Sequence, residues 1–350
     1  MIKHSSLEEI EQYRLDPGIS QSFLKTVLAN KTEEFKETLP MILGSLLDCI
    51  LTSPALVDVI YAPSLAKRPS DKIKEIVDVV LELAMKEESP STDIHYWKDN
   101  LLVVARQKEY QSRWGDDAIL NTLLKEAESY WNETVGNRDK ILVTQAEWDA
   151  MHVAASLTLS SHVTGKYFID QEKVDKYFQL PIFWNHKGTP CKGLIDELII
   201  EHETKTIYII DFKGSTANSL KEWFNIARNK NYNFQMSWYY RGVVQNFQDL
   251  ISDGYSIECR WVVIPLSNKF KPWIVPCTSL MLQAGRYGTK YLKTVEIGKV
   301  ELDIEYEREG WNAALEIYLK CKENDWLDWD YSWYESNGKL DQKLANNYFF

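Results

Sequence analysis

The chain has 350 residues, of which 45% are hydrophobic and 26% are charged. This composition is typical of a folded protein and excludes a chain that is disordered throughout. The formal net charge of −11 disfavours a protein that coats nucleic acid non-specifically, because that requires clustered Lys and Arg. The length favours one elaborated core with a substantial helical addition.

Cysteines and apolar runs exclude several other classes of protein. The five cysteines form no Cys-x-x-Cys pair, so they predict neither a zinc site nor a disulfide framework. The N-terminal residues lead directly into polar sequence, and no apolar run reaches membrane-spanning length. We therefore expect a cytoplasmic protein without a membrane partner.

Helical patterns dominate the first part of the chain. A turn at residues 16–18 precedes the run 19–25, where Ser20 suits a helix N-cap. Apolar residues at helical spacing in 42–51 predict a second helix, which carries Asp48 as its single carboxylate. A buried aspartate without a partner is costly, so Asp48 should either meet a cation or lie at a wet edge.

Residues 62–139 are charged and predict several amphipathic helices without a catalytic pattern. Short runs rich in β-branched and aromatic residues then predict strands. A helix is expected next, followed by two further strands and a last helix. The predicted strands are 177–184, 192–200, 207–212, 256–264 and 273–275, and the last helix is 305–320.

The stretch 193–213 predicts a β-hairpin, because two Ile-rich runs flank a polar turn at 202–205. Asp196 and Asp211 would then lie on neighbouring strands. Asp211 and Lys213 would point to the same face, since strand residues i and i+2 share one face. Two carboxylates suit Mg²⁺, which activates water and polarises phosphate. Lys213 could orient that water or stabilise developing charge.

The ordered set Gly193-x-x-Asp196, Asp211-Phe212-Lys213 and Gln235-x-x-x-Tyr239 resembles the core signature of the PD-(D/E)XK nuclease superfamily, in particular its RecB-like and exonuclease VIII-like (lambda-type) branch. The resemblance implies Mg²⁺ or Mn²⁺ as cofactor and Asp196, Asp211 and Lys213 as catalytic residues. It also implies that Gln235 and Tyr239 contact DNA near the cleavage point. Four cations on 221–241 would form a basic flank: Lys221, Arg228, Lys230 and Arg241.

Two further expectations come from the N-terminal region. The Ile-Ser-x-Ser-x-Leu-Lys pattern at 19–25 resembles the opening of exonuclease VIII-like proteins, which implies that Ser20, Ser22 and Arg14 hold the 5′-phosphate of a DNA end. A plain capped helix is the alternative for each serine. The family typically has a metal-binding histidine where this chain has Asp48, so we expect Asp48 to be a third metal ligand or a structural residue.

The predicted fold class is α/β, a mixed central sheet flanked by helices (a restriction-endonuclease-like core) with a helical N-terminal region. The predicted domains are 1–139, 140–322 and an acidic aromatic segment 323–350. The resemblance implies an exonuclease that resects linear duplex DNA from 5′ to 3′ in recombination or repair, with a single-strand annealing recombinase and a homo-oligomeric ring as further expectations. The alternatives are an endonuclease of the same superfamily and a catalytically idle nuclease fold that binds DNA or protein.

Overall fold

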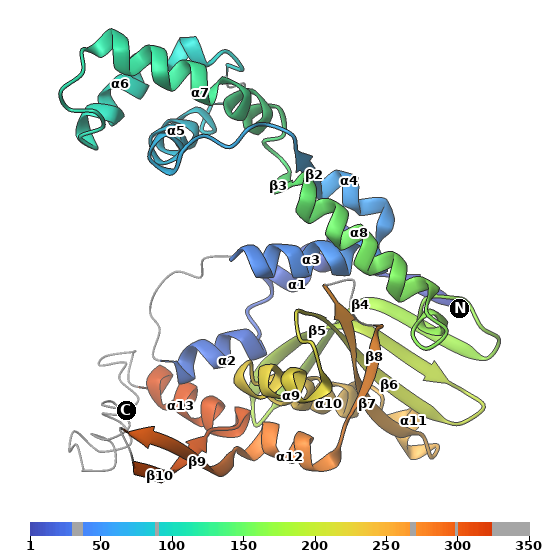
Figure 1. Cartoon of the computed structure of the whole chain (residues 1–350). Coiled ribbons are helices and arrows are strands. Elements are labelled where there is room, and N and C mark those ends of the chain that lie inside the picture. The colour runs from blue at the N-terminus through green and yellow to red at the C-terminus, as the bar shows by residue number, and fades with distance from the viewer. Residues whose placement is uncertain (30–37, 88–90, 267–270, 298–299, 324–350) are drawn as a thin grey trace. The chain divides into compact units, whose positions relative to one another are not determined.

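The computed structural model describes residues 1–29, 38–87, 91–266, 271–297 and 300–323 (Figure 1). The chain divides into two compact units, one of 1–44 with 154–350 and one of 45–153. The boundary predicted between 139 and 140 falls inside the second unit, and the segment predicted from 323 onward lies outside the described residues beyond 323. No helix in the described part of the chain is both long and apolar enough to cross a membrane.

A six-stranded mixed sheet forms the centre of the first unit, with the strand order β1-β4-β5-β6-β7-β8. The pairs β4–β5, β5–β6 and β7–β8 are antiparallel, whereas β1–β4 and β6–β7 are parallel. The predicted mixed central sheet is therefore confirmed. The strands are β1 (Ile2–His4), β4 (Val174–His186), β5 (Thr189–Glu201), β6 (Thr206–Ser215), β7 (Ser256–Pro265) and β8 (Trp273–Cys277).

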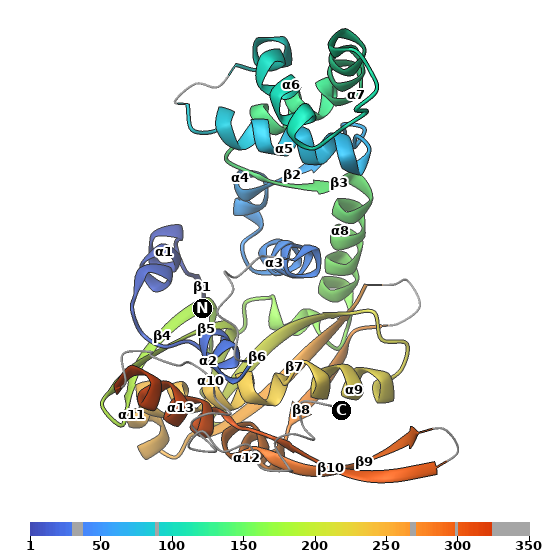
Figure 2. The same cartoon turned by 90° about the vertical axis from the view of Figure 1, so that its left-hand side faces the viewer.

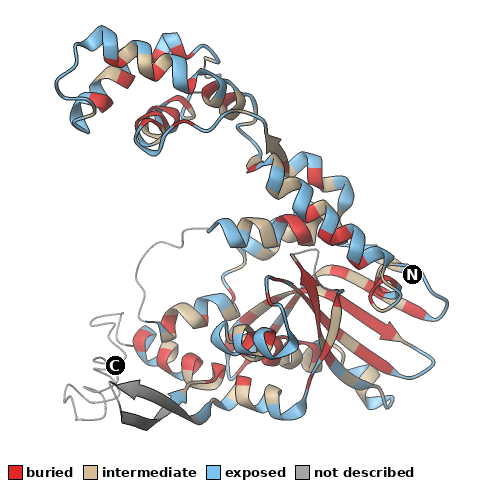
Figure 3. Ribbon diagram, in the orientation of Figure 1, coloured by how far each residue is buried: buried red, intermediate tan, exposed pale blue. Residues whose placement is uncertain are grey.

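Helices flank this sheet, and the strands are largely buried (Figure 3). The helix α10 packs across β4, β5, β6 and β7. On the opposite face, Phe168 stacks on Phe178 and Phe212 with ring centroids 6.0 and 5.4 Å apart. The helical elements of the first unit are α1 (Leu7–Leu15), α2 (Gln21–Leu28), η3 (Gly165–Tyr167), α9 (Leu220–Asn229), α10 (Tyr232–Asn246), α11 (Gln248–Ser252), α12 (Ser279–Tyr287) and α13 (Trp311–Glu323).

The C-terminal part of the first unit corrects one prediction. Residues 305–308 are not helical as predicted but end the strand β10 (Val300–Arg308), which pairs antiparallel with β9 (Thr289–Ile297). Figure 2 shows this hairpin as a separate two-stranded arm at the bottom of the view. The last helix starts only at Trp311, whose buried indole donates to Ser237 Oγ at 3.0 Å and so fastens α13 to α10.

The second unit is mainly helical, as predicted. A parallel pair of short strands, β2 and β3, accompanies the helices. Its core is a cluster around Trp131, which is fully buried. The elements are η1 (Pro54–Leu56), α4 (Val57–Ile60), β2 (Tyr61–Ser64), α5 (Asp71–Ala84), η2 (Ile94–Trp97), α6 (Lys98–Gln107), α7 (Asp116–Gly136) and β3 (Ile141–Thr144), and the helices α3 (Leu39–Thr52) and α8 (Gln145–Ser160) cross from one unit to the other.

Candidate active site

Asp211 and Lys213 form the centre of the candidate site. Both lie on β6, and the predicted hairpin of β5 and β6 is confirmed. The two side chains share one face, as their spacing predicts, because Lys213 Nζ lies 2.7 Å from Asp211 Oδ2. The Asp211 side chain is 1% exposed and that of Lys213 is 15% exposed. The result is a buried carboxylate with an ammonium group at its solvent side.

Asp196 contributes the second carboxylate from β5. Its Oδ2 accepts a hydrogen bond from the backbone N–H of Phe212 at 2.8 Å. This bond fixes the carboxylate beside the backbone segment that carries Asp211 and Lys213, and it crosses the two strands of the hairpin. The two aspartates are therefore neighbours in the structure although 15 positions separate them in the sequence.

Gln235 and Tyr239 lie one helical turn apart on α10, and Gln235 Nε2 donates to Tyr239 Oη at 2.9 Å. Burial raises the pKa of Tyr239 well above its usual range, and the charges of Asp196 and Asp211 raise it further. The tyrosine hydroxyl therefore stays protonated at neutral pH beside both carboxylates, where it can donate to an oxygen of a ligand.

Gly193 allows this close approach of α10 to β5. A Cβ atom at Gly193 would lie 3.2 Å from Cδ1 of the Tyr239 ring. Such a contact is tight enough to require the ring to move. Packing therefore explains the glycine of the sequence pattern, because the glycine leaves room for the ring of Tyr239, whose pKa the charges of Asp196 and Asp211 raise.

Lys25 is a site residue that the sequence pattern did not reveal. Its Nζ donates to the backbone carbonyl of Lys230 at 3.3 Å and lies 5.7 Å from the centre of the Phe234 ring. Burial lowers its pKa to about 8, with a further lowering by the charge of Lys213 and a rise caused by Asp211. Lys25 thus adds a second ammonium group near the Asp211–Lys213 pair.

The N-terminal segment reaches this place by pairing with β5. Ile19 forms a bridge with Cys191, and its N–H and carbonyl bond to Pro190 and Lys192 at 2.9 and 2.8 Å. This connection places α2, and with it Lys25, at the sheet. Lys25 is the last residue of the 19–25 pattern, so the sequence contained the residue. Only the fold shows that this residue of the pattern approaches the carboxylates.

The side chains of the three residues that were predicted to bind the 5′-phosphate have fewer interactions with described residues than the side chain of Lys25 has. Ser20 caps α2, as predicted, by accepting from the N–H of Phe23 at 3.3 Å. Ser22 is exposed, and its hydroxyl accepts a bond from Gln21 at 2.8 Å. Arg14 is exposed near the end of α1. Their contact with DNA remains a prediction.

Asp48 lies on α3, in the half-buried part of that helix, and belongs to the second unit. The predicted helix is confirmed. The backbone carbonyl of Asp48 accepts from Thr52 Oγ1 at 2.7 Å. Its role as a third metal ligand also remains a prediction.

A divalent cation fits the two carboxylates of the first unit. Oδ1 of Asp211 has no hydrogen-bond partner among the described residues, whereas Oδ2 has the ion pair with Lys213 at 2.7 Å. Buried carboxylate oxygens without donors are costly. Within the described ranges, no three Asp, Glu, His or Cys side chains gather into a metal cluster. Mg²⁺ often binds through one or two protein carboxylates with water and substrate oxygens as the other ligands, so Asp196 and Asp211 suffice as the protein part of such a site.

A second buried carboxylate, Glu197, lies on the opposite face of the sheet. Both of its oxygens lack a hydrogen-bond donor among the described residues. Burial raises the pKa of Glu197 well above its usual range, Lys176 opposes this rise, and Asp196 adds to it. Lys176 Nζ donates to the carbonyls of Lys166 and Ile169, both at 2.6 Å.

Comparisons with known proteins add little to the evidence that comes from the site residues. No protein-family profile matches the chain, and no curated protein matches it. A crystal structure from Eubacterium rectale, named "Putative exonuclease", is similar over 80% of each chain, with a TM-score of 0.41 and 12% sequence identity. The functional argument therefore rests on the residues of this chain.

Proposed function

We propose that the chain is a metal-dependent nuclease that hydrolyses phosphodiester bonds in DNA. The observation that carries this proposal is the Asp211–Lys213 pair, with its N–O distance of 2.7 Å, on the same hairpin as Asp196. Tyr239 lies beside both carboxylates. Carboxylates, an ammonium group and a protonated hydroxyl around one point match the needs of phosphoryl transfer, which depends on positioning and on stabilising charge.

Asp196 and Asp211 would hold Mg²⁺ or Mn²⁺, which polarises the phosphate and lowers the pKa of an attacking water when bound. Lys213 places its ammonium where negative charge develops on the phosphate oxygens. Tyr239, oriented by Gln235, donates to the DNA backbone. Lys25 adds positive charge at the same place, which attracts the phosphate chain in a protein of net charge −11.

Exonuclease action on linear duplex ends, in the 5′-to-3′ direction and in the service of recombination or repair, is the finer form of the proposal. It rests on the resemblance of the 19–25 pattern. The packing of that segment against β5 supports it, because Lys25 approaches the catalytic hairpin from there. The proposed ligands of the 5′-phosphate are Ser20, Ser22 and Arg14. The proposed oligomeric state is a homo-oligomeric ring, and the proposed partner protein is a single-strand annealing recombinase.

The test uses the purified full chain, Mg²⁺, an end-labelled linear duplex and a covalently closed circle. We expect the linear duplex to lose nucleotides from its 5′ ends while the closed circle stays intact. Cleavage of the circle at a comparable rate would instead identify an endonuclease. If the folded chain cleaves neither substrate with Mg²⁺ or Mn²⁺, the nuclease proposal is wrong.

Asp48 needs its own test, because it belongs to the second unit. As a third metal ligand it would make the site more negative and favour Mg²⁺ over softer ions. Asp48→Ala should then lose most activity at low Mg²⁺, and Asp48→His should shift the preference toward Mn²⁺. Activity of Asp48→Ala equal to that of the parent would make Asp48 a structural residue.

A further inference from the structure

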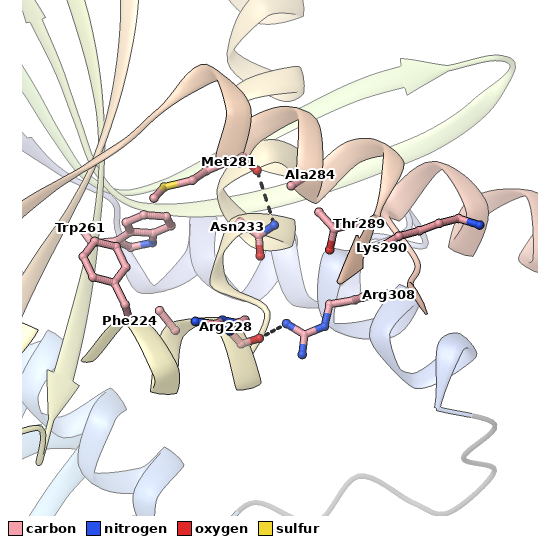
Figure 4. A pocket seen from close by; sticks show the side chains of 10 residues that line it. Phe224, Arg228, Asn233, Trp261, Met281, Ala284, Thr289, Lys290 and Arg308 are labelled. Carbon is pink, nitrogen blue, oxygen red and sulfur yellow. Dashed lines mark hydrogen bonds between the residues drawn. The ribbon is translucent and has the colours of Figure 1, made fainter. Parts of the chain in front are cut away.

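A pocket of about 500 Å³ opens in the first unit among α9, α10, β7, α12 and the β9–β10 hairpin (Figure 4). This volume lies in the range of sites for small organic ligands. No residue of the proposed catalytic set lines it. The lining residues are Phe224, Ala227, Arg228, Asn233, Trp261, Met281, Ala284, Thr289, Lys290 and Arg308.

One end of the pocket is aromatic and apolar. Trp261, Phe224 and Met281 stand together there (Figure 4). Trp261 is 3% exposed, and its Nε1–H has no hydrogen-bond acceptor among the described residues. A buried indole N–H normally finds a partner. An acceptor on a bound molecule would satisfy it.

The other end is cationic. Arg228, Lys290 and Arg308 line it, and the Arg308 guanidinium donates to the backbone carbonyl of Arg228. Lys290 has an ion pair with Glu307 at 3.3 Å. Arg228 forms no ion pair with a described residue, and its guanidinium has only a long bond of 3.4 Å to Asn225. The lining of the pocket therefore combines guanidinium groups with aromatic rings.

The pocket begins one strand away from the candidate active site. Trp261 on β7 is the register partner of Asp211 on β6, so both side chains point to the same face of the sheet. The C-terminal end of α9 connects the two places as well, because Arg228 lines the pocket and the carbonyl of Lys230, the C-cap residue of α9, accepts from Lys25. A molecule in the pocket would lie beside DNA bound at Asp211 and Lys213.

We propose that this pocket binds one nucleotide unit, with its base against Trp261 and Phe224 and its phosphate at Arg228 and Arg308. Base stacking on aromatic side chains and guanidinium contacts to phosphate are the two interactions that such a unit requires. Asn233 and the Trp261 N–H provide polar contacts for the edge of a base. The choice of a nucleotide over another aromatic anion rests on the proposed nuclease function.

The test measures binding of deoxynucleoside monophosphates to the full chain by calorimetry in EDTA, where hydrolysis cannot occur. We expect binding that weakens at least tenfold in Arg228→Gln and in Ala284→Phe, which fills the pocket. Lys271→Gln, at an exposed position outside the pocket, and Gln283→Phe, next to Ala284 but outside the pocket, should bind like the parent. Inorganic phosphate and unphosphorylated nucleoside should each bind at least tenfold more weakly than the monophosphate.

Binding of short single-stranded oligonucleotides shows whether the pocket takes the terminal nucleotide of a DNA strand or a free, released nucleotide. Competition of an oligonucleotide with the monophosphate in the parent, together with direct oligonucleotide binding that weakens in Ala284→Phe, supports a strand end as the ligand. Binding of the monophosphate alone supports a released product. Both outcomes uphold the nucleotide site.

Three results would overturn the proposal: no binding of any monophosphate at millimolar concentration, equal binding of inorganic phosphate, or unchanged binding in Arg228→Gln. Arg228→Gln keeps the proposal testable if Ala284→Phe does not fold. The binding assay does not depend on cleavage, so the two proposals can fail separately. If the chain binds nucleotides but does not hydrolyse DNA, the proposed nuclease function is wrong and the nucleotide pocket still stands.

Discussion

Two buried carboxylates lie on opposite faces of the same sheet, each with a lysine near it, and only one has the surroundings of a reaction site. Asp211 has its ion pair with Lys213, whose side chain is 15% exposed. Glu197 lies near Lys176, which is 1% exposed and donates to two backbone carbonyls. The first lysine can meet a substrate, whereas the second is enclosed by the protein.

This contrast shows that burial and a perturbed pKa do not by themselves identify a catalytic group. Burial raises the pKa of Glu197 well above its usual range, yet the aromatic rings of Phe178 and Phe212 cover its face of the sheet. Asp211 differs in its neighbours: a second carboxylate, two ammonium groups and a tyrosine hydroxyl converge on it. Solvent access and the convergence of functional groups therefore distinguish Asp211 from Glu197 as the candidate catalytic residue.

The largest expected effect is on the rate of DNA hydrolysis in Asp211→Asn. If the protein binds a metal as proposed, the remaining carboxylate, Asp196, would not hold it alone in the required position. We expect a loss of about a thousandfold or more in the single-turnover rate of cleavage, the order of loss on removal of an essential catalytic residue. The measurement is single-turnover cleavage of linear duplex at limiting Mg²⁺.

The matched control for this variant is Glu197→Gln on the opposite face, which makes the same change of acid to amide. Its hydrolysis rate should stay within about threefold of the parent, because it touches neither metal nor substrate. Equal losses in Asp211→Asn and Glu197→Gln, with both proteins folded, would show that the comparison between the two faces is wrong.

The second effect separates the two lysines. Lys213→Ala should keep DNA affinity and lose roughly a hundredfold in rate, the order of loss on removal of one preorganised donor. Lys176→Met should instead lower the free energy of unfolding, by about 2 kcal/mol or more, since it leaves the carbonyls of Lys166 and Ile169 without their donor. Binding, rate and urea denaturation of both variants are the measurements. If Lys213→Ala loses DNA affinity by the same factor as it loses rate, Lys213 contributes to binding only.

The local part of the site could be predicted from the sequence. The period of two in a strand places Asp211 and Lys213 on one face, and the spacing of four in a helix places Gln235 against Tyr239. The hairpin that holds Asp196 beside Phe212 follows from two Ile-rich runs around a short turn. These relations depend on neighbours in the chain, so periodicity suffices to find them.

Relations between distant segments could not be predicted in this way. Lys25 reaches the site only because Ile19 pairs with the edge of β5 near Cys191. The nucleotide pocket needs α9, β7, α12 and β10 together, and the end of β10, residues 305–308, was wrongly predicted as the start of a helix. Charged residues at 305–308 resemble a helical face, but pairing with β9 decides their conformation.

The third effect concerns Lys25, whose pKa of about 8 results mainly from burial. As the pH rises through about 8, Lys25 loses its charge, so DNA affinity measured in EDTA should fall. Lys25→Arg should remove this part of the pH dependence, and Lys25→Met should bind weakly at all pH values and reduce the salt slope by about one. A parent and a Lys25→Arg variant with identical pH profiles would exclude Lys25 from the DNA site.

The smallest effect is the dependence of stability on pH in Glu197→Gln. The pKa of Glu197 in the folded protein is raised above its usual value of 4.5, so the folded state keeps a proton that the unfolded chain releases. Between 4.5 and the raised pKa, the parent therefore loses stability as the pH rises, by up to about 1.4 kcal/mol per pH unit. The glutamine variant has no such proton, and any packing cost of its amide is the same at every pH. Urea denaturation between pH 5 and 7 should show that the variant gains stability relative to the parent as the pH rises, until the pH reaches the raised pKa of Glu197. If the parent gains instead, Glu197 is ionised and held by Lys176, and the two faces of the sheet carry the same kind of ion pair.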